Sequence, residues 1–404
     1  MGVTDQHLSA GSQKYAGLLS SACGGMFVFG IVMAILGAVL PELTDKLLLN
    51  KAEAGNLFLY MNFAMLVMSL LFGPVVDRFG FKSFLIFCSL LVAVSFAVFS
   101  RVDSYSMVIL AAAVLGFGGG GLNGGTNALT SDIRPEKRGP ALNLLGIYFG
   151  FGALFIPFLI GTLFAKAGVS SVLLLAAIVS LIPFFLFLIV KFPRPKHPQG
   201  FPIQQAASVI RNPMLWLCSG LLFFQSGNEF TVGGWISTYL HENFGFTAAV
   251  ASIFLAGYWG AIMAGRLVSS RILAKFGNEK VILFASIISL LAAALIRFSP
   301  DRFLSGAGAV LIGLGFAAVF PTTLAVIGEN FPEFTGTAFS VAFVIALAGG
   351  MISPWITGKI AYAYTLRQGF SLPVFNCAVI LIFSLFMLRS RRSQKNGNVL
   401  SKES

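Results

Sequence analysis

Charged side chains are scarce in this sequence. Asp, Glu, Lys and Arg make up only 10% of the 404 residues, whereas hydrophobic residues make up 57% and the mean hydropathy is +0.87. Soluble domains carry a charge on roughly a quarter of their residues. The composition therefore excludes a water-soluble globular protein and indicates a membrane protein.

Histidine and cysteine are too few and too scattered to predict a metal centre. The histidines lie in tails or loops, and the cysteines lie singly inside apolar runs without the spacing of a ligand set. These residues are His7, His197, His241, Cys23, Cys88, Cys218 and Cys377. We interpret the cysteines as small buried side chains and expect neither a metal nor a bound cofactor.

One glycine-rich stretch imitates a nucleotide-binding loop. Gly116 to Gly121, "GFGGGG", has the spacing of a dinucleotide motif but lies inside an apolar run, without the preceding strand that such a loop requires. Close packing of helices explains these glycines, and nucleotide binding is not expected.

Long apolar runs are abundant where charges are missing. A bilayer core about 30 Å thick needs ~20 apolar residues per helical crossing, and twelve such runs alternate with short charged loops. They lie near 17–40, 54–76, 83–100, 105–131, 139–165, 169–190, 213–240, 247–273, 280–298, 303–328, 335–363 and 370–389. The runs are continuous rather than alternating, which favours helices over barrel strands. The predicted fold is an all-α membrane protein with twelve transmembrane helices.

The net charge of +12 indicates topology rather than a nucleic-acid partner. When the loops are assigned to alternating sides of the spans, most of the 27 Lys and Arg residues fall on the side that holds both termini. The positive-inside rule then places both termini in the cytoplasm. We expect a multi-pass protein of the bacterial plasma (inner) membrane, whose partners are the lipid bilayer and a small molecule.

An offset of 197 residues aligns the first six spans with the last six. Several glycines and prolines coincide at this offset: Gly30 with Gly227, Gly37 with Gly234, Gly80 with Gly277, Gly116 with Gly313, Gly152 with Gly349, and Pro157 with Pro354. The repeat predicts two pseudo-symmetric six-helix halves, 1–190 and 212–404, joined by a cytoplasmic linker at 191–211; the second half ends in a basic cytoplasmic tail. Duplicated halves are typical of transporters that expose a mid-membrane site to each side in turn.

The loop between the second and third spans reads "GPVVDRFGFK", Gly73 to Lys82. It resembles the G-x-x-x-D-R-x-G loop of the major facilitator superfamily, and the resemblance to that superfamily covers essentially the whole chain. The resemblance implies a cytoplasmic latch for the outward-open state, in which Gly73 allows a close helix approach and Gly80 a tight turn. Asp77, followed by Arg78, would face a helix N-terminus or a cation. The alternative interpretation is a charged turn that only obeys the positive-inside rule.

Two other loops bear on this latch. "DIRPEKRG", which ends at Gly139, resembles the superfamily's loop after the fourth span, and its Arg138 is a further gating candidate. In the second half, "SRILAKFGNEK" keeps Gly277 but has Ala274 where the first half has Asp77. This degenerate copy predicts that the two halves are latched unequally.

A narrower resemblance is carried by Asn127, by "LNL" around Asn143 and by the Pro-x-x-x-Gly that begins at Pro157. These motifs are similar to the branch that contains the fucose and glucose symporters and the sodium-dependent glucose-transporter-like proteins. The resemblance implies a monomeric carrier that moves a sugar or polyol together with a proton or a sodium ion. Fucose-type members place proton-linked carboxylates where this chain has Gly37 and Asn123, so proton coupling by that route is not expected.

Other functions remain as alternatives. An exporter that exchanges a drug, lipid or metabolite for protons has the same architecture, and the direction of net flux would discriminate it from a symporter. The sequence contains no membrane-facing constellation of nucleophile, base and acid, so an enzyme is not expected.

The stretch "GNEFTVGGW" places Glu229 deep in the seventh span. A carboxylate at that depth is costly and usually faces the bundle interior or a water-filled cavity. Helical spacing puts Gln225 on the face of Glu229, with Asn228 beside them. Glu229 would accept hydrogen bonds from substrate hydroxyl groups, bind sodium or take up a proton; the structural alternative is a Glu bonded to another helix.

The remaining candidates carry weaker signals. Asn123 and Asn127 lie four residues apart on the fourth span and would present amides to a cavity or bond to another helix. Asn62 and Trp259 coincide at the 197 offset and form a possible pocket wall, to which Tyr258 could also contribute a ring. Plain packing is the alternative for each.

Arg266 lies about two turns from the cytoplasmic end of the eighth span. Its side chain would extend to the membrane surface or pair with Glu329. We expect a gating or structural role for Arg266 rather than contact with substrate.

Overall fold

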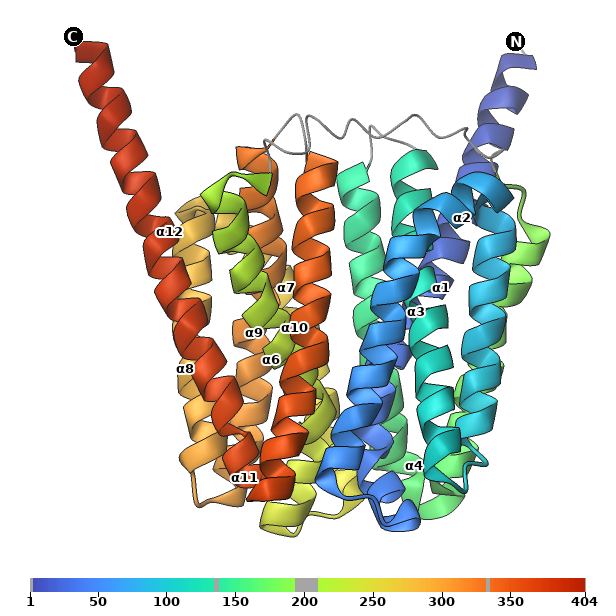
Figure 1. Ribbon diagram of the computed structural model, residues 1–404. Coiled ribbons are helices and arrows are strands. Elements are labelled where there is room, and N and C mark those ends of the chain that lie inside the picture. The colour runs from blue at the N-terminus through green and yellow to red at the C-terminus, as the bar shows by residue number, and fades with distance from the viewer. Residues whose placement is uncertain (1–2, 134–137, 193–209, 332–334, 404) are drawn as a thin grey trace. The chain divides into compact units, whose positions relative to one another are not determined.

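The computed structural model describes residues 3–133, 138–192, 210–331 and 335–403, and within them it consists of helices joined by short connections (Figure 1). The helices are α1 (Val3–Leu47), α2 (Lys51–Phe99), α3 (Tyr105–Ile133), α4 (Arg138–Ile189), α6 (Pro213–Phe244), α7 (Ala248–Phe276), α8 (Asn278–Phe298), α9 (Arg302–Asn330), α10 (Thr335–Ala363), α11 (Leu366–Gly369) and α12 (Ser371–Glu403). The predicted all-α fold is confirmed.

Two of the helices contain two membrane crossings each. α2 turns at Gly80 (φ 79°, ψ 158°) and α4 turns at Gly168 (φ 70°, ψ 156°), conformations that residues with a Cβ rarely adopt. Gly277, the counterpart of Gly80, has nearly the same conformation (φ 81°, ψ 160°) between α7 and α8. With these two helices counted twice and the four-residue α11 left out, the described chain makes the twelve predicted crossings.

The seventh crossing, α6, differs from the others in polarity. Eleven segments of the described chain are long and apolar enough to span a membrane, and α6 is not among them although it has 32 residues. Gln225, Asn228 and Glu229 lie near the middle of α6 and interrupt its apolar character. The helix that is least suited to lipid therefore has to be sheltered by its neighbours.

The chain forms two compact units, residues 1–200 with 247–256, and residues 201–246 with 257–404. In the first unit α1 packs mainly on α4, and α2 packs on α3. In the second unit α6 packs mainly on α10, and α8 packs on α9. The predicted linker, 191–211, lies mostly outside the described residues, and the predicted boundaries of the halves stay a prediction.

Glycines bring the paired helices into backbone contact, and similar contacts occur in both units, although the contacted residues Phe27 and Phe223 are one position off the 197 offset. In the first unit, a Cβ at Gly152 of α4 would collide with the carbonyl oxygen of Phe27 in α1. In the second unit, a Cβ at Gly349 of α10 would collide with the carbonyl oxygen of Phe223 in α6. Small residues are the usual means by which helices approach each other in lipid, where the hydrophobic effect does not press them together.

A second pair of contacts follows the 197 offset without deviation. A Cβ at Gly116 would meet the carbonyl of Met61, and a Cβ at Gly313 would meet the carbonyl of Tyr258. Met61 and Tyr258 are themselves counterparts in the repeat. The coinciding glycines of the sequence thus mark equivalent helix crossings in two pseudo-symmetric halves.

Replacing Gly152 with Ala is expected to destabilise the protein by about 1–3 kcal/mol, because overpacking forces the two backbones apart. Gly146→Ala, in the same helix, is the matched control, since a Cβ there meets no atom within 4 Å. Thermal unfolding of the protein in detergent measures both. A Gly152→Ala variant as stable as the Gly146→Ala variant would contradict the close contact of α1 and α4.

Candidate functional site

Glu229 lies near the middle of α6 and is only 8% exposed. An uncompensated carboxylate would be very costly at such a place, because neither water nor lipid solvates it. The structure supplies an opposite charge. Nη2 of Arg266 in α7 lies 3.9 Å from Oε1 of Glu229.

The direction of helical side chains explains how the two charges meet. Side chains tilt toward the N-terminus of their own helix. α6 and α7 follow each other through a short connection, so they run in opposite directions and their side chains lean toward each other. Arg266 therefore extends toward Glu229 at the middle of α6. Its side chain keeps 31% exposure, against 11% for that of Glu229.

This pairing was missed in the sequence, where Glu329 or the membrane surface was the expected destination of Arg266. Glu329 accepts a hydrogen bond of 2.7 Å from Nδ2 of Asn278. The signal that could have found the pair is the tilt of side chains on consecutive antiparallel helices. Sequence spacing alone does not give the rotation of α7 about its axis, on which the contact depends.

Gln225 and Asn228, which precede Glu229 in α6 by four residues and one residue, are completely buried. Nε2 of Gln225 donates to the carbonyl oxygen of Phe316 at 3.4 Å, and Nδ2 of Asn228 donates to Sγ of Cys377 at 3.2 Å. Within the described residues, Oε1 of Gln225 and Oδ1 of Asn228 have no hydrogen-bond partner. Two buried acceptors without a donor are unusual and call for an occupant or a rearrangement.

Tyr258 and Trp259 enclose the same region from α7. The Tyr258 hydroxyl donates to the carbonyl oxygen of Glu229 at 3.1 Å. Trp259 packs on Gly233, where a Cβ would lie 2.9 Å from the indole ring, and the two rings meet edge to face at 5.1 Å. Both are buried, 0% and 2% exposed, so in this conformation they form a wall of the Glu229 cluster rather than an open surface for a ligand.

The candidate asparagines of the first unit lie on two helices, Asn123 and Asn127 on α3 and Asn62 on α2. Nδ2 of Asn127 lies 2.9 Å from both the backbone oxygen and Oδ1 of Asn123, so the two predicted neighbours do meet on α3. Asn62 of α2 is fully buried, and its Nδ2 donates to the carbonyl oxygen of Phe58 at 2.9 Å. Oδ1 of Asn62 has no hydrogen-bond partner among the described residues.

The predicted latch lies in α2 around the turn at Gly80. Nζ of Lys82 donates to the carbonyl oxygen of Leu188 near the end of α4, at 2.7 Å. Arg78 extends over the ring of Phe79, 5.3 Å from its centroid. A Cβ at Gly73 would meet nothing within 4 Å in the described structure, so the close helix approach expected there is not found. The side chains of Asp77 and Arg138 lie outside what the structure describes.

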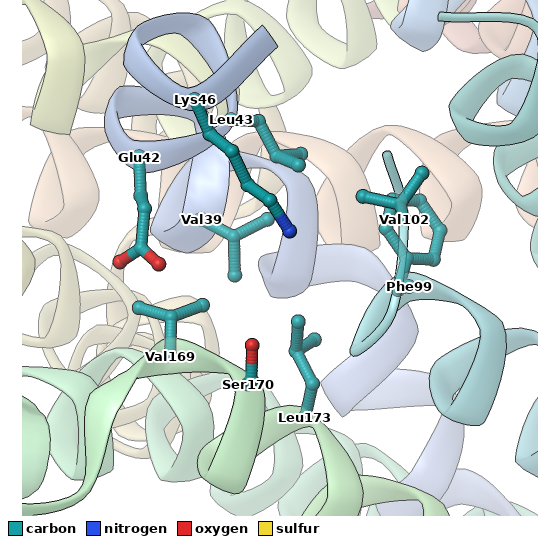
Figure 2. Close-up of a pocket in the computed structure, with 9 residues that line it drawn as sticks. All are labelled: Val39, Glu42, Leu43, Lys46, Phe99, Val102, Val169, Ser170 and Leu173. Atoms are coloured by element: carbon teal, nitrogen blue, oxygen red, sulfur yellow. The ribbon is translucent and has the colours of Figure 1, made fainter. Parts of the chain in front are cut away.

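A small hollow in the first unit lies apart from these groups (Figure 2). Glu42 and Lys46 of α1 line it one helical turn apart, and Ser170 of α4 adds a hydroxyl group. The remaining lining is apolar: Val39, Leu43, Phe99, Val102, Val169 and Leu173. In the described part of the chain no three His, Cys, Asp or Glu side chains are grouped as a metal would require.

The described architecture agrees with a comparison of the sequence with protein families. The family model of the Major Facilitator Superfamily matches residues 22–354 and, in a second match, residues 218–403. The chain belongs to this family. It is a multi-pass membrane transporter and not an enzyme.

Individual relatives are distant but match nearly end to end. A glucose/galactose transporter of Brucella abortus biovar 1 (strain 9-941) is 23% identical over 403 residues, covering 95% of this chain and 97% of the relative. The multidrug resistance protein MdtG of Citrobacter koseri (strain ATCC BAA-895 / CDC 4225-83 / SGSC4696) is 24% identical and covers 93% and 95%. Among solved structures, the fucose:proton symporter of E. coli has a TM-score of 0.65 at 18% identity, over 92% of this chain and 99% of that one. The last similarity concerns the fold.

Glu229→Gln and Arg266→Gln are each expected to destabilise the protein, because each removes the opposite charge from a group in low dielectric. The double variant should lose less free energy of unfolding than the two single variants lose together, which corresponds to a coupling free energy of about 0.5–3 kcal/mol. Unfolding in detergent gives all four stabilities. Glu229→Gln combined with Arg302→Gln, at the first residue of α9, is the control and should be additive. If the losses of stability in Glu229→Gln and Arg266→Gln are additive, the contact between Glu229 and Arg266 is contradicted.

Proposed function

We propose that this transporter is a symporter that moves a sugar or a similar polyol by alternating access, driven by a proton or sodium gradient. The observation that carries the proposal is the buried Glu229, paired with Arg266 and flanked by unsatisfied amide oxygens. The name of the Brucella relative supports the sugar class.

The chemistry of the pair suits a coupling site. Glu229 is buried and Arg266 is partly buried, and well-packed apolar side chains often stabilise such a place as well as an ion pair does, so the pair favours a role beyond packing. A proton or a cation that binds Glu229 would weaken its attraction to Arg266. Ion binding would thereby change the contact between α6 and α7, which is the kind of change that alternating access requires. The structural alternative is that the pair only fixes α6 against α7.

The same proposal includes the topology and the surroundings. Both termini lie in the cytoplasm, as the placement of Lys and Arg favours, and the membrane is the bacterial inner membrane. The two halves, 1–190 and 212–404, move against each other around a central site, and the carrier works as a monomer. The latch residues Gly73 to Lys82, with Arg138, hold one of the two end states.

An exporter of a drug, lipid or metabolite in exchange for protons is the second candidate. It is favoured by one observation, the end-to-end similarity to a multidrug resistance protein. The direction of net flux under an imposed gradient discriminates the two.

Uptake of labelled hexoses, deoxyhexoses and polyols into proteoliposomes tests the proposal, with inward proton and sodium gradients imposed separately. Accumulation of a sugar above equilibrium is expected under one gradient and should be lost in Glu229→Gln. Glu279→Gln is the matched control, because Glu279 has the same 8% exposure but lies in the first turn of α8. The Glu279→Gln variant should still accumulate the sugar.

Two outcomes would count against the proposal. If folded protein accumulates none of the sugars under either gradient, the symporter is wrong and the exporter is favoured. If Glu229→Gln accumulates sugar as well as Glu279→Gln does, then the carboxylate plays no part in coupling.

A further inference from the structure

Three oxygen-bearing side chains share one face of α6 within little more than a helical turn. Gln225, Asn228 and Glu229 are spaced i, i+3 and i+4, so their side chains lie on adjacent parts of the helix surface. Gln225 and Asn228 are 0% exposed and Glu229 is 8% exposed. The two amide groups use their nitrogens in hydrogen bonds, and their oxygens stay without a partner in the described structure.

This arrangement suits a metal cation better than it suits a proton. Carboxylate and amide oxygens are the ligands of hard cations. A protonated Glu229 has one O–H donor, which can satisfy at most one of the two amide oxygens and leaves the other buried and unpaired. A single carboxylate balances one positive charge, so a monovalent ion leaves less uncompensated charge in the low-dielectric interior than a divalent ion does.

We propose that Gln225, Asn228 and Glu229 form a sodium site within the second unit and that Arg266 competes with the ion for Glu229. This inference rests on the proposed symport and names its coupling ion. The guanidinium of Arg266 lies 3.9 Å from Glu229 and supplies the positive charge that sodium would replace. When sodium binds, both cations would crowd one carboxylate, and Arg266 withdraws.

The position of Arg266 allows this withdrawal. Its side chain is 31% exposed, whereas that of Glu229 is 11% exposed, so Arg266 is less enclosed by the protein than Glu229 is. A long side chain can keep its stem in apolar surroundings while its head moves to a wetter place. Sodium binding and the position of Arg266 are therefore thermodynamically linked, and each affects the other equally.

The repeat supports a site in this unit alone. The residues 197 positions before Gln225, Asn228 and Glu229 are apolar, and Arg266 corresponds to a serine. These counterparts are Val28, Ile31, Val32 and Ser69. At these equivalent positions the first half thus has neither the oxygen ligands nor the competing cation.

Sodium binding to the full-length protein in detergent tests the inference without any sugar. Thermal unfolding is followed while NaCl replaces choline chloride at constant ionic strength, since a ligand of the folded state raises its stability in proportion to RT ln(1 + [L]/Kd). We expect a sodium-dependent rise in melting temperature that potassium does not reproduce. Equal melting temperatures in sodium, potassium and choline would overturn the proposal.

Variants locate the site. Glu229→Gln should abolish the sodium effect, and Gln225→Leu and Asn228→Leu should each raise the apparent Kd for sodium by at least about tenfold. Arg266→Gln should lower the apparent Kd, because the competing cation is gone. Thr238→Val is the matched control: Thr238 is also fully buried on α6 with a hydroxyl that has no partner among the described residues, but it lies more than two helical turns beyond Glu229.

The two outcomes that matter for the mechanism are separable. If Gln225→Leu and Asn228→Leu leave the sodium affinity unchanged, the two amides are not ligands of the ion. If Arg266→Gln raises the apparent Kd for sodium, Arg266 does not compete with the ion. Because binding is measured without transport, a sodium site found in a protein that accumulates no sugar would refute the proposed substrate and not the site. Sugar accumulation driven only by a proton gradient would refute sodium as the coupling ion and would leave the proposed substrate class intact.

Discussion

The structure of the second unit depends on neutralising one carboxylate inside the membrane. Glu229 cannot be left alone at the middle of α6, because its charge would face a medium that solvates it poorly. Arg266 supplies the opposite charge from α7, and Tyr258, two turns earlier on the same helix, binds the backbone of Glu229. α6 and α7 are therefore joined through polar contacts as well as by the packing of Trp259 on Gly233, and any ligand that changes the charge of Glu229 acts directly on their contact.

Close helix packing makes this polar centre possible. Gly349 brings the backbone of α10 onto α6, and Gly233 admits the ring of Trp259. Such contacts exclude lipid and water from the helix that the composition marks as least apolar. The similar contact of Gly152 in the first unit shows that both units have this scaffold, although their polar side chains differ.

Much of the fold was predictable because lipid imposes simple rules. Apolar runs of the required length gave the twelve crossings, and the coinciding glycines gave the pseudo-symmetry. The depth of Glu229 was likewise visible in the sequence. Its partner Arg266 was not, nor was the bond from Asn228 to Cys377, because both depend on how neighbouring helices are rotated. The meeting of Asn123 and Asn127 was predictable, since it lies within one helix.

The two halves have kept one scaffold and divided its polar groups between them. Asn62, Asn123 and Asn127 of the first half correspond to Trp259, Phe320 and Leu324 of the second. Conversely, the polar residues of α6 and Arg266 correspond to Val28, Ile31, Val32 and Ser69. At these positions the first half presents neutral amides alone, and the second half adds a carboxylate and a guanidinium to the amides of Gln225 and Asn228. Neutral amides suit the hydroxyl groups of an uncharged substrate, whereas a carboxylate with a competing cation suits an ion. A duplicated carrier divided in this way can bind its substrate through one half and its driving ion through the other. The buried polar groups of both halves are then satisfied only when substrate and ion are bound together.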